Sequence, residues 1–264
     1  MNNTYPSPET IIALSELYKC YWVGDVAFPA LNGVNLTVDR GEFMVLAGRS
    51  GSGKTTLLNI IGGLEVADHG SVKVCHQDFG QRNRDERASF RLNHVGFVFQ
   101  AYNLIRVLSA RENVAFVCQL QGLERRQCLD IADRWLDEVG LREFSDRRPD
   151  QLSGGQQQRV AVARALATNP DLVLADEPTA NLDTTTGKAL IALIKRLNMD
   201  LGTTFIISSH DPDVIENAGR LIPLVDGRVA DDKQPPSEKP SATLCPPPKC
   251  SLQQRLWRLL GLGA

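Results

Sequence analysis

Residues 43–61, FMVLAGRSGSGKTTLLNII, decide the fold of this 264-residue chain. The apolar run Phe43–Ala47 predicts a buried strand, and Lys54–Ile61 predicts a helix that ends at the glycines 62–63. Between them lies the pattern GxxxxGK(S/T), whose glycines let successive backbone N–H groups face phosphates while the helix start adds partial positive charge. The predicted nucleotide-binding residues here are Gly48, Arg49, Ser50, Gly51, Ser52, Gly53, Lys54, Thr55 and Thr56.

Two carboxylates, Asp176 and Glu177, follow the apolar residues 172–175, where a buried strand would not ordinarily place charge. Beside a phosphate-binding loop, such a pair indicates hydrolysis of ATP. We expect Lys54 to bridge the terminal phosphates, and Thr55 and Asp176 to hold Mg²⁺. Glu177 is then placed to polarise the attacking water. The alternatives are a glycine turn with an incidental lysine and carboxylates that merely cap a turn.

Strands and helices alternate along most of the chain. Alternating polarity over residues 11–41 predicts antiparallel strands. The other predicted strands are 70–74, 95–99, 172–175 and 204–208, and the predicted helices are 111–121, 127–139, 154–167 and 186–201. This order predicts an α/β fold of the P-loop type, with a mainly parallel sheet, an antiparallel β subdomain and a helical subdomain over about 101–165. Ligands bind beyond the carboxyl ends of such strands.

Composition narrows the class of protein. The chain is 42% hydrophobic and 23% charged with a formal net charge of -2, so it offers no general attraction to nucleic acid. Its apolar runs fall far short of the roughly 20 residues that span a bilayer. The polar start of the chain lacks the features of a secretory signal. We therefore expect a cytoplasmic protein that does not bind nucleic acid.

A second glycine-rich helix start occurs at residues 152–156, LSGGQ. One ATP does not need two such sites from one chain. With this segment, residues 11–230 resemble the ABC ATPase family, in which LSGGQ of one subunit closes over ATP held by another. The resemblance implies a head-to-tail homodimer in which ATP also contacts Ser153, Gly154, Gly155 and Gln156.

The resemblance assigns roles to further residues. Gln100 looks like the Q-loop glutamine that contacts Mg²⁺ and the attacking water, and His210 looks like the switch histidine that senses the γ-phosphate. Asp183 lies in a segment similar to the D-loop that crosses the dimer interface, with Asn181 in place of the commoner alanine. The implied catalytic set is Lys54, Gln100, Glu177 and His210, and the implied metal ligands are Thr55, Gln100 and Asp176.

Tyr21 resembles the aromatic residue that stacks on adenine in this family, and Tyr18 and Trp22 are close enough to compete for that role. Arg159 and Arg164, which follow LSGGQ, are interpreted as structural or solvated side chains rather than catalytic ones.

Residues 98–104, 109–113 and 176–183 resemble the lipoprotein-release and macrolide-export group of the family. This resemblance implies an FtsX-like permease partner, a periplasmic adaptor as a further candidate partner, and a position at the inner face of the membrane. A soluble ABC ATPase acting on DNA or ribosomes is disfavoured, because the chain has neither a coiled-coil insertion nor a second cassette. An ATP-driven regulatory subunit of a signalling or cell-wall complex, without solute transport, stays open.

Residues 231–264 are expected to form a proline-rich linker and a short amphipathic tail. Ser251 can cap a helix that places four leucines on one face, beside two arginines. A docking helix and a frayed terminus are both compatible with about 11 residues, which is below the length at which helices persist alone.

Overall fold

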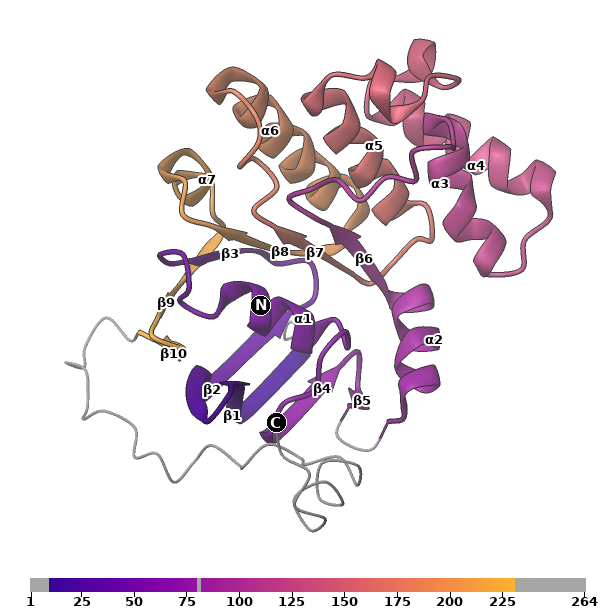
Figure 1. Ribbon diagram of the computed structural model, residues 1–264. Helices are drawn as coiled ribbons and strands as arrows, with labels where there is room; N and C mark the ends of the chain where they lie inside the picture. Colours follow the sequence, from indigo (N-terminus) through magenta and orange to yellow (C-terminus); the bar gives the residue numbers. More distant parts are fainter. Residues whose placement is uncertain (1–9, 80–81, 231–264) are drawn as a thin grey trace, which may run out of the picture.

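The computed structural model describes residues 10–79 and 82–230. Two sheets form its centre (Figure 1), one of six strands in the order β10-β9-β3-β8-β7-β6 and one of four strands in the order β2-β1-β4-β5. The six-stranded sheet contains β3 (Phe43–Ala47), β6 (Val95–Val98), β7 (Leu172–Asp176), β8 (Thr204–Ser209), β9 (Arg220–Val225) and β10 (Arg228–Val229). The four-stranded sheet contains β1 (Thr10–Val23), β2 (Val26–Asp39), β4 (His69–Val74) and β5 (Gln77–Asp78).

The six-stranded sheet is parallel except at β10, which pairs antiparallel with β9. All pairs in the four-stranded sheet are antiparallel. The predicted fold class is therefore confirmed. The predicted linker and tail, residues 231–264, lie outside the described residues.

Helices cover both faces of the parallel sheet. Figure 1 shows α5, α6 and α7 on one face, with α1 between the other face and the antiparallel sheet. The helices are α1 (Lys54–Ile61), α2 (Arg84–His94), α3 (Ala110–Leu120), α4 (Arg125–Glu138), α5 (Gly154–Leu166), α6 (Thr184–Leu201) and α7 (Pro212–Glu216), with 3₁₀ turns at Arg142–Phe144 and Pro149–Gln151. No helix in the described ranges 10–79 and 82–230 is long and apolar enough to cross a bilayer.

Successive side chains of each central strand point to opposite faces of the sheet, and this alternation explains why helices cover both faces. In β3, Met44 and Leu46 join the apolar cluster that contains α1 and the antiparallel sheet. Phe43 and Val45, which point the other way, join the cluster that contains α5 and α6. Strands β7 and β8 divide their side chains in the same manner. Because both faces of these strands are apolar, both must be covered.

A third apolar cluster holds α3, α4 and the outer side of α5 together. Each of α3 and α5 begins with a reciprocal capping box, formed by Ser109 with Glu112 and by Ser153 with Gln156. These caps account for the clear helix starts in the sequence. The predicted helices 111–121 and 127–139 match α3 and α4 to within two residues.

Helix α2 was missed by the sequence interpretation. Asn83 and Glu86 form its capping box, but Phe90 is the one buried residue among its eleven. A helix with a single buried residue shows almost no helical periodicity of apolar residues, so the sequence pattern does not indicate it. The predicted strand 95–99 also ends one residue early, at Val98.

A glycine substitution tests the contact between β6 and α5. A Cβ on Gly96 would lie 2.3 Å from the Ala165 carbonyl oxygen, so backbone must shift to admit it. Gly96→Ala is expected to lower the free energy of unfolding by about 1–3 kcal/mol in denaturant titrations. Gly187→Ala is the control, because a Cβ there meets Thr179 at an ordinary 3.5 Å. That change should be neutral or stabilise the helix by up to about 1 kcal/mol. Equal stabilities of the two variants would contradict this packing.

Candidate active site

The predicted site residues outside LSGGQ, Asp183 and Tyr21 gather at the carboxyl ends of the parallel strands. Strand β3 leads into the loop 48–53, β7 ends at Asp176, β8 ends at Ser209, and the chain reaches Gln100 two residues after β6. A pocket of about 310 Å³ lies there. It is lined by Ala30, Ser50, Gly51, Gly53, Lys54, Thr55, Thr56, Gln100, Glu177, Ala180 and His210.

The loop 48–53 needs its glycines for two reasons. Gly51 and Gly53 have φ angles of 80° and 102°, which side chains other than glycine rarely adopt. A Cβ on Gly53 would also lie 2.4 Å from the Ala30 carbonyl oxygen. Gly53 is the N-cap of α1, and no side chain caps that end of the helix. The uncapped N–H groups are therefore directed at the pocket, where an anion can accept from them.

Lys54 is held at the back of this loop. Its side chain is 5% exposed, and its Nζ donates to the carbonyl oxygens of Gly48 at 2.7 Å and Arg49 at 3.1 Å. Its Nζ also lies 3.4 Å from Glu177 Oε1. A buried ammonium group at this position can donate charge-assisted hydrogen bonds to a phosphate at the pocket edge.

Asp176 is surrounded by hydroxyl donors. Thr55 Oγ1 lies 3.1 and 2.9 Å from its two carboxylate oxygens, and Ser208 Oγ donates to Oδ1 at 2.5 Å. Carboxylate and hydroxyl oxygens from the start of α1 and the end of β7 thus converge on one point. Such a hard oxygen donor set fits Mg²⁺, which binds through one or two carboxylates and keeps several waters.

Glu177 is held in an unusual backbone conformation. Its φ is 46°, in the left-handed region, and its N–H donates to both the carbonyl and the hydroxyl oxygen of Ser208. Its carboxylate oxygens each lie 3.0 Å from His210 Nδ1. Strained backbone that neighbouring groups impose is typical of reactive sites. The structure therefore brings Lys54, Glu177 and His210 together, as the resemblance implies.

Tyr21 lies beside the phosphate loop. Its hydroxyl donates to Glu65 Oε2 at 2.6 Å and lies 3.4 Å from Thr56 Oγ1, while the residue stays 39% exposed. Burial, followed by the Glu65 hydrogen bond, raises the pKa of Tyr21 to about 12, so the phenol is neutral at physiological pH. An accessible ring near Thr56 is compatible with stacking on a nucleotide base.

The LSGGQ residues lie elsewhere. Within the described chain, none of residues 153–156 is among those that line the 310 Å³ pocket. Helices α1 and α5 cover opposite faces of the six-stranded sheet (Figure 1). Ser153 Oγ accepts from Gln156 N at 3.3 Å, and a Cβ on Gly155 would lie 2.4 Å from Thr186 Cγ2. One chain therefore does not bring its two glycine-rich helix starts to the same pocket.

Asp183 caps α6 and does not line the pocket. Its carboxylate accepts from Thr186 N at 3.0 Å and Thr186 Oγ1 at 2.6 Å, and these hydrogen bonds hold the pKa of Asp183 below its usual range. Two residues earlier, Asn181 Nδ2 donates to the Gln100 carbonyl oxygen at 2.9 Å. The segment before α6 is thus tied to the segment after β6.

Arg164 also holds that segment, a contact that the sequence interpretation missed. Tyr102 and Asn103 have φ angles of 60° and 49°, and their carbonyl oxygens accept from Arg164 Nη2 at 3.0 Å and Nη1 at 2.6 Å. A methyl on Gly154 would lie 2.8 Å from the Tyr102 hydroxyl, so the segment also touches the start of α5. The two carbonyl groups that Arg164 holds belong to the residues that follow Gln100.

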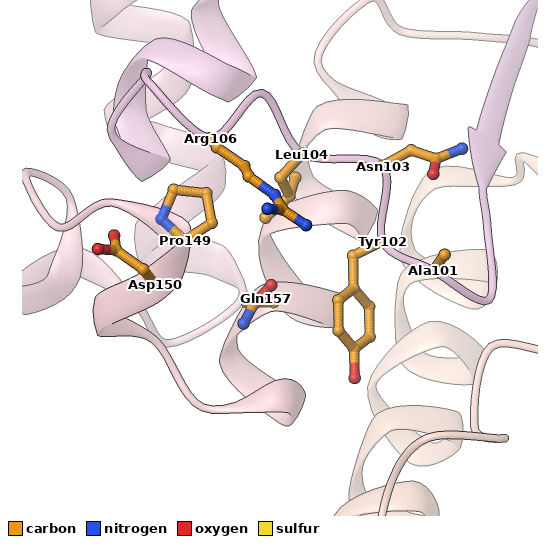
Figure 2. A pocket seen from close by; sticks show the side chains of 8 residues that line it. All are labelled: Ala101, Tyr102, Asn103, Leu104, Arg106, Pro149, Asp150 and Gln157. Carbon is orange, nitrogen blue, oxygen red and sulfur yellow. The ribbon is translucent and has the colours of Figure 1, made fainter.

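Figure 2 shows a second pocket, of about 570 Å³, between this segment and the turn before α5. Its lining consists of Ala101, Tyr102, Asn103, Leu104, Arg106, Pro149, Asp150 and Gln157. Leu104 in this loop packs against the apolar cluster of α3, α4 and α5. The Arg164 hydrogen bonds restrain this loop together with two hydrogen bonds between Asn113 and the backbone of Ile105.

Comparison with known proteins agrees with the geometry. A family model described as "ABC transporter" matches residues 31–180. The lipoprotein-releasing system ATP-binding protein LolD of Anaeromyxobacter dehalogenans is 44% identical over 228 residues, which cover 86% of this chain and 95% of LolD. The macrolide export ATP-binding/permease protein MacB of Rhodopirellula baltica is 43% identical over 224 residues, which cover 84% of this chain. The matched region is 33% of that MacB, so the chain spans about a third of its length.

Solved structures show the same fold. The cassette MJ0796, as a dimer in a post-hydrolysis state bound to ADP and Pi, superposes with a TM-score of 0.78 at 40% identity, covering 83% of this chain and 97% of that one. The chain belongs to the ABC transporter family. It is an ATP-binding, ATP-hydrolysing subunit of that family.

Replacing Arg164 tests whether its hydrogen bonds position Gln100. Arg164→Lys keeps a charge but cannot donate in a fork to two carbonyl oxygens. We expect kcat for ATP hydrolysis to fall roughly tenfold to a hundredfold while KM for ATP changes little, because Arg164 does not line the nucleotide pocket. Steady-state ATPase assays over a range of ATP concentrations measure both constants.

Arg159→Lys on the same helix is the matched control, since Arg159 Nη1 donates to the Val139 carbonyl oxygen instead. A normal kcat in Arg164→Lys, or an equal loss in Arg159→Lys, would show that the restraint on the Gln100 segment does not matter for turnover.

Proposed function

We propose that two copies of this chain form a head-to-tail dimer with two composite ATP sites and drive an FtsX-like permease. The arrangement of Lys54, Glu177 and His210 around one pocket carries this proposal, with Asp176 hydrogen-bonded to the pocket residue Thr55. The pocket lacks the residues 153–156 of its own chain, and the MJ0796 cassette resembling this chain is dimeric. We infer that residues 153–156 of a second copy complete the pocket.

In the proposed cycle, the loop 48–53 and Lys54 bind the phosphates of ATP. Thr55 and Asp176, with Gln100 beside them, would hold Mg²⁺, which neutralises charge on the phosphates when bound. Glu177 accepts the proton of the attacking water, and His210 orients the Glu177 carboxylate through Nδ1. Ser153, Gly154, Gly155 and Gln156 of the second copy close the site, and Asp183 crosses between the copies.

ATP thereby joins the two cassettes, and hydrolysis lets them separate. The hydrogen bonds from Arg164 and Asn181 to the Gln100 segment connect this closure to the helices α3–α5. Movement of that helical part, over about residues 101–165, would change the shape of an attached membrane subunit.

Glu177→Gln tests the assigned base. A glutamine cannot accept the proton, so turnover should fall by roughly a hundredfold or more, while ATP binding is kept. Size-exclusion chromatography with ATP should show accumulation of the dimer. Glu138→Gln, on the exposed end of α4, is the control and should behave as the unsubstituted chain. Ordinary turnover by Glu177→Gln would remove Glu177 from the role of base.

An apolar groove supplies a surface for the permease. It encloses about 670 Å³ between α2, β6, the segment 103–105 and α3. Four apolar side chains at the groove are exposed to solvent by about a third to a half, namely Leu64, Ile105, Phe116 and Leu120. Exposed apolar side chains gathered at one groove mark an interaction site. The MacB relatives are named ATP-binding/permease proteins and continue well beyond the matched region, so a permease is the occupant we propose.

With a permease as its partner, the subunit would lie on the inner face of the membrane, against the cytoplasmic side of the permease. The names of the LolD and MacB relatives suggest lipoproteins or macrolides as substrates. We add peptides as a further candidate substrate and a periplasmic adaptor as a further candidate partner. ATP-dependent movement of such substrates in reconstituted vesicles would test the choice among them.

Leu120→Glu tests the groove. A charge at this exposed position should abolish co-purification with the co-expressed permease in detergent and its stimulation of ATP hydrolysis. The basal ATPase rate should stay unchanged, because Leu120 lies outside the nucleotide pocket. Met199→Glu, on α6 and 68% exposed, is the matched control and should retain the permease. Equal recovery of permease with both variants would rule out this groove as the docking surface.

A further inference from the structure

Three side chains with different metal-binding atoms meet at the edge of the sheet opposite the nucleotide pocket. Cys75 lies in the turn between β4 and β5, His94 is the last residue of α2, and Asp171 immediately precedes β7. A sulfur, an imidazole nitrogen and a carboxylate oxygen from these residues all lie within 4.8 Å of one another. The cluster is half-buried and shares no residue with the ATP site.

The contacts of Asp171 favour one kind of cation. Its Oδ1 accepts from Arg40 Nη1 at 2.9 Å, and its Oδ2 lies 2.8 Å from His94 Nδ1. Because Arg40 already neutralises this carboxylate in part, a cation here must be held chiefly by thiolate and imidazole. Those donors suit Zn²⁺ and are poor ligands for Mg²⁺ or Ca²⁺.

The turn that carries Cys75 is unusual for a hairpin. Val74 pairs with Gln77, so Cys75 and His76 are the two turn residues, with φ angles of 48° and 61°. Hairpin turns with two left-handed residues are dominated by asparagine and glycine. Neither is present, and the Cys75 side chain instead packs partly against the apolar core, which fixes its sulfur beside Asp171. Such strain is a reason to look for a role of the side chain.

We propose that Cys75, His94 and Asp171 form a Zn²⁺ site, with water as the fourth ligand. A tetrahedral site with a Zn–S distance of about 2.3 Å and Zn–N of about 2.0 Å places its ligand atoms roughly 3.5 Å apart. Small side-chain rotations would bring the Cys75 sulfur closer to the other two ligand atoms, and would separate His94 Nδ1 from Asp171 Oδ2, which lie 2.8 Å apart. The ion would join the antiparallel sheet, α2 and the parallel sheet at one point, which is a structural role independent of ATP hydrolysis.

Cobalt is the probe, because a cobalt–thiolate bond gives a charge-transfer absorption band that oxygen and nitrogen ligands do not give. The full chain carrying Cys245→Ser and Cys250→Ser is titrated with Co²⁺ in the absence of nucleotide and Mg²⁺. We expect the thiolate band to appear and then disappear when Zn²⁺ displaces Co²⁺. The nucleotide pocket has no cysteine in its lining, so Co²⁺ bound there would not produce the band.

Cys75→Ser in this background should abolish the band, and His94→Gln should weaken Co²⁺ binding more than about tenfold. His69→Gln, an exposed histidine at the other end of β4, is the matched control and should bind as the background does. Zn²⁺ at a hundredfold excess over its dissociation constant should raise Tm by roughly 5 °C in the background and in His69→Gln only.

The basal ATPase rate of Cys75→Ser should be unchanged. This measurement distinguishes failure of the Zn²⁺ site from failure of the proposed ATPase function. Absence of the thiolate band in the background would overturn the proposal, as would a band that persists in Cys75→Ser. If Cys75→Ser fails to fold, His94→Gln decides, because it keeps the thiol and removes one ligand. Unaltered Co²⁺ binding by His94→Gln would overturn the proposal and leave the cluster as an ion pair beside a half-buried thiol.

Discussion

The burial of β3, β7 and β8 on both faces is the constraint on which the rest of the structure depends. Their side chains alternate between two apolar clusters, so neither face can be left to water. Helices must therefore cross over the sheet after each strand, and the parallel crossovers bring every strand end to one edge. The phosphate loop after β3 and the carboxylates at the end of β7 meet there because of core packing, before any ligand binds.

Hydrogen bonds at that edge then fix the positions of the functional side chains more precisely than apolar packing does. Ser208, the fifth residue of β8, donates to Asp176 and accepts from the backbone of Glu177. These bonds hold Glu177 in a left-handed conformation that costs on the order of 1–3 kcal/mol. The carboxylate is thereby held between Lys54 and His210. The stability of the sheet thus offsets the backbone strain at Glu177, and the site is arranged before a ligand binds.

The sequence was most informative where local chemistry alone decides the structure. Apolar runs, glycine turns and capping boxes placed β3, α1, β7 and α5 within a residue or two. The P-loop and the carboxylates of β7 were found because few other structures need those residues at that spacing. Helix α2 escaped because its face is almost entirely polar. The Arg164 contacts were not predicted for a different reason. Arg164 is separated from its two partners by 61 and 62 positions in the sequence, and no local sequence pattern indicates such a contact.

The LSGGQ helix start is stabilised within its own chain. The Ser153 hydroxyl and the Gln156 side chain satisfy two N–H groups of α5 reciprocally, which stabilises the helix without any ligand. A Cβ at Gly155 would lie 2.4 Å from Thr186 Cγ2, and one at Gly154 would lie 2.8 Å from the Tyr102 hydroxyl, so either change would displace a neighbouring side chain. A self-sufficient helix start can therefore be presented to a second molecule as a preformed surface. The segment after Gln100 contacts this helix through the Tyr102 hydroxyl and the Arg164 hydrogen bonds, so the residues after β6 and the start of α5 are connected within one chain.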